Sequence, residues 1–282
     1  MAEALELRRT RETHRRRITV MVALSIALLA LLVVFAVFGT FLTPHDHEEQ
    51  RLFVSDTPPS AEFWAGTDQL GRDVFSRTII GARPALVGAM TVSVGAFAIA
   101  TVLGLSAGYL GGATDGFIMR WADLMLALPG LLIAIVVVGV FGGGFWVAVL
   151  VLILLFSAPD TRIVRSAVLQ QRPLPYIEAA RTLGVSKPRV MFGHILPNVL
   201  PIIFAYVVLD FAFALVALAG LSFLGLGIEP GAADWGRMLS ENRSLLFSNP
   251  WAAVVPAVLI ILTAAAMNLV GDWMYDRFSL RQ

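Results

Sequence analysis

Five long stretches of this chain are almost free of charge, and they constrain its fold more than any other feature. Together they cover 144 of the 282 residues and contain a single charged side chain, Asp210. A bilayer core about 30 Å thick needs about 20 apolar helical residues per crossing. The chain is therefore expected to be an all-α polytopic membrane protein. The stretches are 18–42, 84–110, 124–159, 195–228 and 250–271.

The five stretches predict six transmembrane helices. The stretch 124–159 is too long for one crossing, and three consecutive glycines, Gly142–Gly144, interrupt it. Because glycine disfavours a helix by about 1 kcal/mol per residue, we expect one helix to end near Phe141 and the next to begin near Phe145. The stretch 195–228 also exceeds one crossing, but its last residues are typical of a helix end followed by a loop.

The distribution of Lys and Arg predicts the orientation. Cytoplasmic loops carry an excess of basic residues, and six crossings place both termini on one side. That side would hold 15 of the 21 basic residues, so both termini are predicted to be cytoplasmic. The basic N-terminus is interpreted as this topology signal, not as a nucleic-acid site. The predicted parts are a cytoplasmic N-terminus 1–17, a first helix 18–42, an outside loop 43–83, five helices within 84–272 with a cytoplasmic loop 161–194, and a cytoplasmic tail 273–282.

The cytoplasmic loop 161–194 is predicted to contain a short helix. Pro173 and Pro175 mark its start, and Gly184 stands where a left-handed C′ glycine would end it. Ser186, followed by Pro188, suggests an N-cap and a second helical start. Such a helix would lie across the cytoplasmic face of the membrane and dock into a protein that covers it.

Two polar residues inside the predicted spans are candidates for a substrate pathway. Asp210 is the one charge in these spans, and an ionisable residue at that depth points to function. Asp210 could face the pathway and attract a peptide's amino terminus. It could instead pair with a partner subunit or stay buried and protonated. Asn268 has a weaker claim, because amides often bond one membrane helix to another.

The outside segments carry further candidates. Asp68, Arg72 and Asp73 are interpreted as a local ion network on a solvated loop, where ion pairs contribute little. The segment 229–249 contains Trp235 and Met238 among polar residues and is expected to be amphipathic, at the membrane interface. The region 45–49, with two histidines and three acids, is interpreted as a solvated charge run and not as a metal site. No nucleophile–base pair is visible, so the chain is not expected to be an enzyme.

Several of these residues match known motifs at the right spacing. Glu178, Ala179 and Ala180, then Gly184, then Ile195, Leu196 and Pro197 match the EAA motif of ABC importer permeases. Further matches lie at 66–73, 221–227, 235–239 and 268–272. The chain thus resembles the C-type permease subunit of dipeptide, oligopeptide and nickel ABC importers, over nearly its whole length.

This resemblance implies a type I importer permease fold and a set of partners. The short helix carrying Glu178 would dock on an ATP-binding subunit, and Trp235 and Met238 would belong to the outward mouth that receives a substrate-binding protein. The expected partners are a second, B-type permease, one or two ATPases and the binding protein, in a bacterial inner membrane. No cofactor is expected on this chain, because it has no phosphate-loop motif. ATP and Mg would bind the partner subunits.

Three alternatives stay open at this point. A nickel or other small-solute importer would share the same motifs. An ATP-independent secondary transporter would usually show paired inverted repeats, and none is visible in the sequence. A membrane scaffold that transports nothing would not need an EAA loop. The expected function is uptake of dipeptides or oligopeptides, with this chain forming half of the translocation pathway.

Overall fold

The computed structural model is a helical bundle. It describes the backbone of residues 2–279 and the side chains of residues 20–277. Within the described residues there is no strand, only an isolated bridge between Thr67 and Asp73. The longer helices are α1 (Ala2–Leu42), α2 (Val74–Leu110), α3 (Gly112–Leu126), α4 (Gly130–Val140), α5 (Phe145–Gln171), α8 (Leu196–Phe223) and α10 (Trp251–Ser279).

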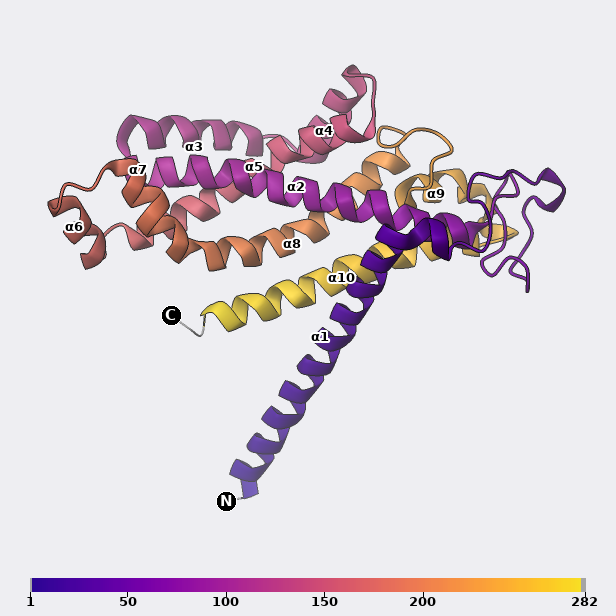
Figure 1. The fold of residues 1–282 in the computed structure, drawn as a ribbon, viewed down its shortest axis with the longest axis horizontal. Helices are drawn as coiled ribbons and strands as arrows, with labels where there is room; N and C mark the ends of the chain where they lie inside the picture. The colour runs from indigo at the N-terminus through magenta and orange to yellow at the C-terminus, as the bar shows by residue number, and fades with distance from the viewer. Residues whose placement is uncertain (1, 280–282) are drawn as a thin grey trace.

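The loops gather at the two ends of this bundle (Figure 1). One end carries the segment 43–73 with the short helix η1 (Leu52–Val54), together with α9 (Trp235–Glu241) and η3 (Arg243–Phe247). The other end carries α6 (Pro175–Thr182) and α7 (Lys187–Arg189), which lead through the π-helical stretch η2 (Val190–Ile195) into α8. The basic side chains of 1–17 and the tail residues 280–282 lie outside the described part.

Five helices of the described chain are long and apolar enough to cross a membrane, or six spans if α3 and α4 count as one. That number agrees with the sequence, but the third span is built differently from the prediction. Its two halves meet at an angle of 84°, and the expected single helix from Leu124 to Phe141 is broken. Pro129 causes the break, because it lacks an N–H and disfavours helical geometry in the residue before it.

Two helices extend beyond the charge-free stretches. Helix α2 begins ten residues before Pro84, because the Asp73 carboxylate caps it by accepting hydrogen bonds from the N–H groups of Phe75 and Ser76. Helix α5 continues through Pro159 to Gln171, so the first third of the predicted loop 161–194 is helical. Pro84 and Pro159 are both accommodated inside their helices.

The core lies between α2, α5 and α8. Close packing of α2 on α5 depends on small residues, as is common between membrane helices. A Cβ atom added to Gly104 would lie 2.7 Å from the Val164 side chain. One cluster of buried apolar residues includes Val92, Leu152 and Leu215. A second cluster fills the end of the bundle beneath α6.

Helices α1 and α4 leave most of their apolar surface uncovered. Val33, Val37 and Phe38 of α1 are exposed, as are Val136 and Val140 of α4. Large uncovered apolar surfaces mark contacts with lipid or with another protein. Both helices therefore present surfaces that fit lipid or another protein chain.

Candidate coupling and pathway sites

Helix α6 is seated on the bundle by one face and leaves the other face free. Pro175 occupies its first turn, where the missing N–H costs nothing. Ile177 and Ala180 are buried against the cluster beneath the helix. Glu178 and Ala179 are exposed. The EAA residues are therefore divided, with two presented outward and one fixing the helix to the membrane helices.

A Schellman motif ends α6. The Val185 N–H donates to the Ala180 carbonyl at 3.1 Å, and the Gly184 N–H donates to the Arg181 carbonyl at 3.0 Å. Gly184 has a φ of +73°, a conformation that glycine adopts without steric cost. The helix predicted from Pro175 and Gly184 is therefore confirmed, with the predicted C′ glycine. Ser186 does stand at the start of α7, but its side chain makes no capping hydrogen bond.

Polar contacts tie α6 to three membrane helices. The Arg181 guanidinium lies 4.9 Å from the ring centroid of Tyr109 on α2, and its Nε donates to the Tyr109 hydroxyl at 3.3 Å. The Tyr176 hydroxyl donates to Gln171 Oε1 on α5 at 2.8 Å and accepts from Asn198 Nδ2 on α8 at 3.3 Å. A displacement of α6 would therefore act on the adjacent ends of all three helices.

The last three motif residues stand where η2 joins α8. Ile195 is fully buried, Leu196 is half-buried and Pro197 is exposed. Asn198 Nδ2 donates to the His194 carbonyl at 2.7 Å. A π-helical turn is rare and often marks a functional site. Here it lies between the short helices α6 and α7 and the longest apolar run of α8.

Asp210 does not stand alone. Its carboxyl group interacts with that of Asp160 on α5. Asp160 is 2% exposed, and each of the two residues has one buried oxygen, Oδ2, with no hydrogen-bond partner among the described residues. Two negative charges in contact are strongly unfavourable in a low-dielectric medium. The sequence does not single out Asp160, because the charge-free stretch 124–159 ends directly before it. Asn268 is half-buried on α10.

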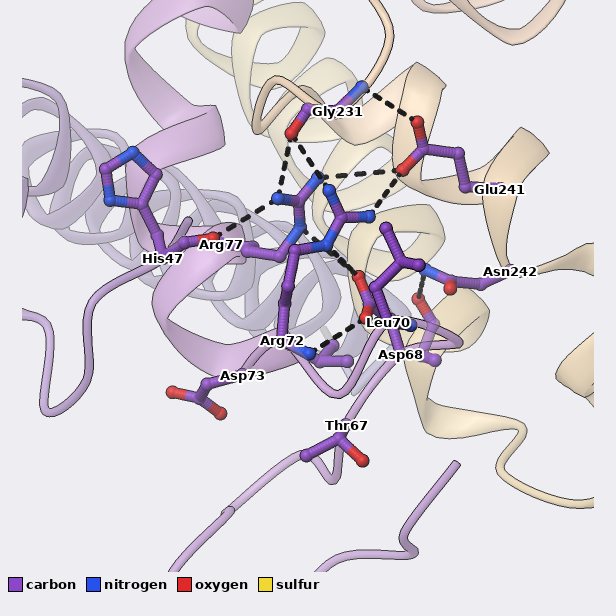
Figure 2. A network of polar contacts seen from close by, with 12 residues as sticks. His47, Thr67, Asp68, Leu70, Arg72, Asp73, Arg77, Gly231, Glu241 and Asn242 are labelled. Carbon is purple, nitrogen blue, oxygen red and sulfur yellow. Dashed lines mark hydrogen bonds and ion pairs between the residues drawn. The ribbon is translucent and has the colours of Figure 1, made fainter. Parts of the chain in front are cut away.

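The outside ion network is buried, which corrects the prediction of a solvated surface cluster (Figure 2). Asp68 and Arg72 are 1% and 4% exposed, and Arg72 Nε donates to Asp68 Oδ2 at 2.6 Å. Arg72 also donates to Glu241 Oε2 of α9 at 2.9 Å. Arg77, equally buried, donates to the carbonyls of His47, Gly231 and Ala232.

Asp73 has a different role from the one predicted, as the cap of α2. The network instead joins the 43–73 segment to Glu241. Burial alone would raise the pKa of the Glu241 carboxyl. Hydrogen bonds from Arg237, the Gly231 N–H and Arg72 outweigh that effect and hold its pKa below the usual value.

Trp235 and Met238 lie inside the protein, at 1% and 0% exposure. They therefore cannot form an outward-facing surface, as the interfacial interpretation of 229–249 required. The Trp235 Nε1–H donates to the Thr78 carbonyl of α2 at 2.9 Å. The Asp234 side chain caps α9, so the helix begins at Trp235. The buried side chains of Trp235 and Met238 then anchor α9 to the bundle. Exposed residues of the same segment, such as Leu246 and Phe247, form its outer surface.

The histidines of the 45–49 run lie beside acids. His45 Nδ1 is 3.4 Å from Asp73 Oδ2, and His47 Nε2 is 3.7 Å from Glu48 Oε1. Among the described residues no group of three or more possible ligands gathers around one point.

Comparison with known proteins places the chain in a family. Residues 100–282 match the model of the binding-protein-dependent transport system inner membrane component. The glutathione transport system permease protein GsiD of Pectobacterium atrosepticum is 40% identical over 273 residues, which cover 94% of this chain and 89% of that protein. The dipeptide transport system permease protein DppC of Alkalihalophilus pseudofirmus is 37% identical over 86% of this chain and 80% of its own length. The chain belongs to the inner membrane components of binding-protein-dependent transport systems, the permease subunits of ABC importers.

Proposed function

We propose that this permease subunit takes up dipeptides and oligopeptides, including small peptides of the glutathione type. Relatives at about 40% identity are named for glutathione and dipeptide transport. The observation that carries the proposal is the arrangement of α6. Its Glu178–Ala179 face is free, while its other face is fixed on the bundle. A helix held in this way can receive a partner and pass its motion to the membrane helices.

The energy for transport would come from that partner. The chain contains no phosphate-loop motif, so ATP and Mg would bind one or two ATPase subunits docked on α6. Closure of the ATPases would displace α6, and the contacts of Arg181 and Tyr176 would pass this motion to α2, α5 and α8. The helices would then exchange inward-open and outward-open states as rigid bodies.

The remaining partners and the orientation follow from the same proposal. A second, B-type permease would cover the exposed faces and complete the pathway. A substrate-binding protein would dock at the end formed by 43–73 and α9. Both termini would be cytoplasmic, in a bacterial inner membrane, with no nucleic acid involved. Asp210, now together with Asp160, and Asn268 are the proposed polar groups of the pathway at membrane depth.

Purification and uptake test this function together. The tagged chain, extracted from its own membrane, should bring a second permease and one or two ATPases with it. The complex in proteoliposomes, with its binding protein outside and ATP inside, should accumulate a labelled dipeptide. Recovery of the chain as a lone homo-oligomer with proton-driven uptake would contradict the proposal. ATP-driven uptake of nickel chelates without peptides would contradict the substrate class alone.

A further inference from the structure

A cavity of about 760 Å³ opens at the end of the bundle that carries the outside loops. Four separate parts of the chain line it: the segment before α2, the first turns of α2, the start of α5 and the loop before α9. Its size falls in the range of about 300–1,000 Å³ that is typical of small-molecule sites. Arg77 holds the first and last of these parts together, because it donates to the carbonyls of His47, Gly231 and Ala232.

Charges of both signs line this cavity and are not used within the chain. Arg83 of α2 and Glu229 of the 228–233 loop are exposed. Among the described residues, neither side chain makes a hydrogen bond or an ion pair. Glu48, also in the lining, is 3.7 Å from His47. Unpaired charges of opposite sign in one cavity fit a ligand that carries both a negative and a positive group.

The start of α5, which no side chain caps, adds to the part of the cavity that can bind a negatively charged group. Gly144 precedes the helix, no side chain caps its first turn, and that turn contains no acidic residue. Gly144, Phe145, Trp146 and Val147 all line the cavity. The N–H groups of a first helical turn have no acceptor within the helix and favour a negative group. They lie in the same cavity as the Arg83 guanidinium.

Apart from His47, the rest of the lining is apolar. Ile80, Val87 and Trp146 contribute uncharged walls. Apolar walls accept side chains of different kinds without requiring a particular hydrogen bond. The charges can therefore recognise only what every free peptide shares, which is one ammonium group and one carboxylate group.

We infer that this cavity is an entry site that holds a free peptide as a zwitterion. The peptide carboxylate binds Arg83 and the start of α5, and the ammonium group binds Glu229 and Glu48. The inference rests on the proposed peptide transport and adds to it a site on the permease itself. The permease itself then selects for free peptide ends.

The test uses the complete transporter in proteoliposomes with its binding protein. Uptake is measured for alanyl-phenylalanine, its C-terminal amide and its N-acetyl form. Arg83→Gln should raise the KM for the free dipeptide about tenfold and leave that for the amide unchanged, because a hydrogen bond to a charged group contributes about that factor. Glu229→Gln should also raise the KM for the free dipeptide about tenfold, and it should leave the KM for the N-acetyl form unchanged. Because the binding protein is the same throughout, its own preference cancels in these ratios.

Matched controls are available on the same face. Arg243→Gln and Glu62→Gln change exposed charges that do not line the cavity, and both should behave as the wild type. Binding-protein-stimulated ATP hydrolysis reports whether each variant assembles. If Arg83→Gln does not assemble, Arg83→Lys, which keeps the charge and should keep the preference, and Glu229→Gln carry the test.

The outcomes separate the two claims. If the wild type shows no ATP-driven dipeptide uptake, the proposed function fails. If the wild type transports but the variants change the free and blocked peptides equally, the entry site is overturned and peptide transport stands.

Discussion

Gly184 shows how one residue fixes the end of a helix. Its φ of +73° lets the chain turn sharply after α6, so that Val185 can bond back to Ala180 and pack into the cluster beneath the helix. A Cβ atom at Gly184 would meet no atom within 4 Å. The requirement for glycine is therefore purely one of backbone conformation, and this is why the sequence alone could predict it.

We expect Gly184→Val to uncouple transport. A β-branched residue in the left-handed region is strained by about 1–3 kcal/mol, enough to loosen the end of α6. The complex should still assemble in the membrane, and peptide uptake per ATP hydrolysed should fall severalfold. Glu178→Lys, which reverses the charge on the free face, should act in the same direction.

Gly116→Val is the matched control for this experiment. Gly116 lies within α3 with open space around it and has no positive φ. Its substitution should change the stability of α3 only slightly, because valine is no worse a helix former than glycine. Wild-type uptake by Gly184→Val and Glu178→Lys would show that α6 is not the coupling element.

Of the two acids Asp210 and Asp160, only the first could be predicted from the sequence. Asp210 could be predicted because it interrupts an apolar run. Asp160 could not, because it follows Pro159 at the edge of such a run, and only the continuation of α5 brings it to Asp210. From the sequence, one possible partner of Asp210 was a residue of another subunit. In the structure its partner is Asp160 of the same chain.

Replacing Asp210 tests the pathway prediction. Asp210→Asn keeps a hydrogen-bonding group beside Asp160 but cannot become negative. Uptake of a peptide with a free amine should fall about tenfold or more, since a charge-assisted contact is lost. Uptake of the amine-blocked peptide should change little. Asp123→Asn, an exposed aspartate of α3, should leave both unchanged. An equal fall for both peptides would assign Asp210 a structural role.

At the scale of elements, the sequence predicts the parts that lie in lipid better than the ends of the helices. Charge-free length reports how much of a helix can be surrounded by hydrocarbon. Helix ends depend instead on caps and contacts, such as the Asp73 cap that starts α2 before Pro84. The bend at Pro129 was missed for a related reason, because no charge marks it.

The outer network could be predicted only in part. Asp68 and Arg72 are four residues apart, so their pairing is visible in the sequence. Glu241 and Gly231, which bury the pair, lie 169 and 159 residues from Arg72. Contacts over that separation leave no local pattern, and the cluster was therefore interpreted as solvated.

The network predicts a dependence of stability on pH. The folded pKa of Glu241 is lowered, so its stabilisation is complete above its unfolded pKa of about 4.5 and is lost as pH falls through the folded pKa. At pH 7, Glu241→Gln should cost about 3 kcal/mol, because Arg72 and Arg77 lose a buried partner. Thermal unfolding of the purified complex should show this difference narrowing below pH 4.5. A difference that stays constant down to pH 3.5 would contradict the role of the charge.

The contact between α6 and α2 gives a second prediction at this scale. Tyr109→Leu removes both the ring beneath Arg181 and the hydroxyl that accepts from its Nε. A cation–π contact contributes about 0.5–2 kcal/mol, so peptide transported per ATP should fall while ATP hydrolysis continues. Tyr109→Phe, which keeps the ring, should lie between this variant and the wild type. Tyr275→Leu on α10 serves as the control, and equal effects of both leucine variants would argue against a specific link.

At the scale of the whole molecule, the two loop ends must lie on opposite sides of the membrane. The chain contains no cysteine, so a single introduced cysteine can be labelled cleanly. In intact cells an impermeant thiol reagent should label Ser60→Cys and Ser248→Cys, both exposed at the outer end. It should label Ser186→Cys, in the turn after α6, only once the cells are opened. The reverse pattern would invert the predicted orientation.

Helix α2 is held at both ends, by the loop before α9 at one end of the bundle and by α6 at the other. Arg77 near its start is fixed to the loop before α9, and Tyr109 near its end is fixed to α6. With a rise of about 1.5 Å per residue, α2 is about 55 Å long, nearly twice the hydrocarbon thickness. A rod of that length acts as a lever: a tilt of about 10° around its midpoint moves its two ends about 5 Å in opposite directions. Closing one side of the membrane as the other opens would then need no relay of small steps, because one pivoting helix does both at once.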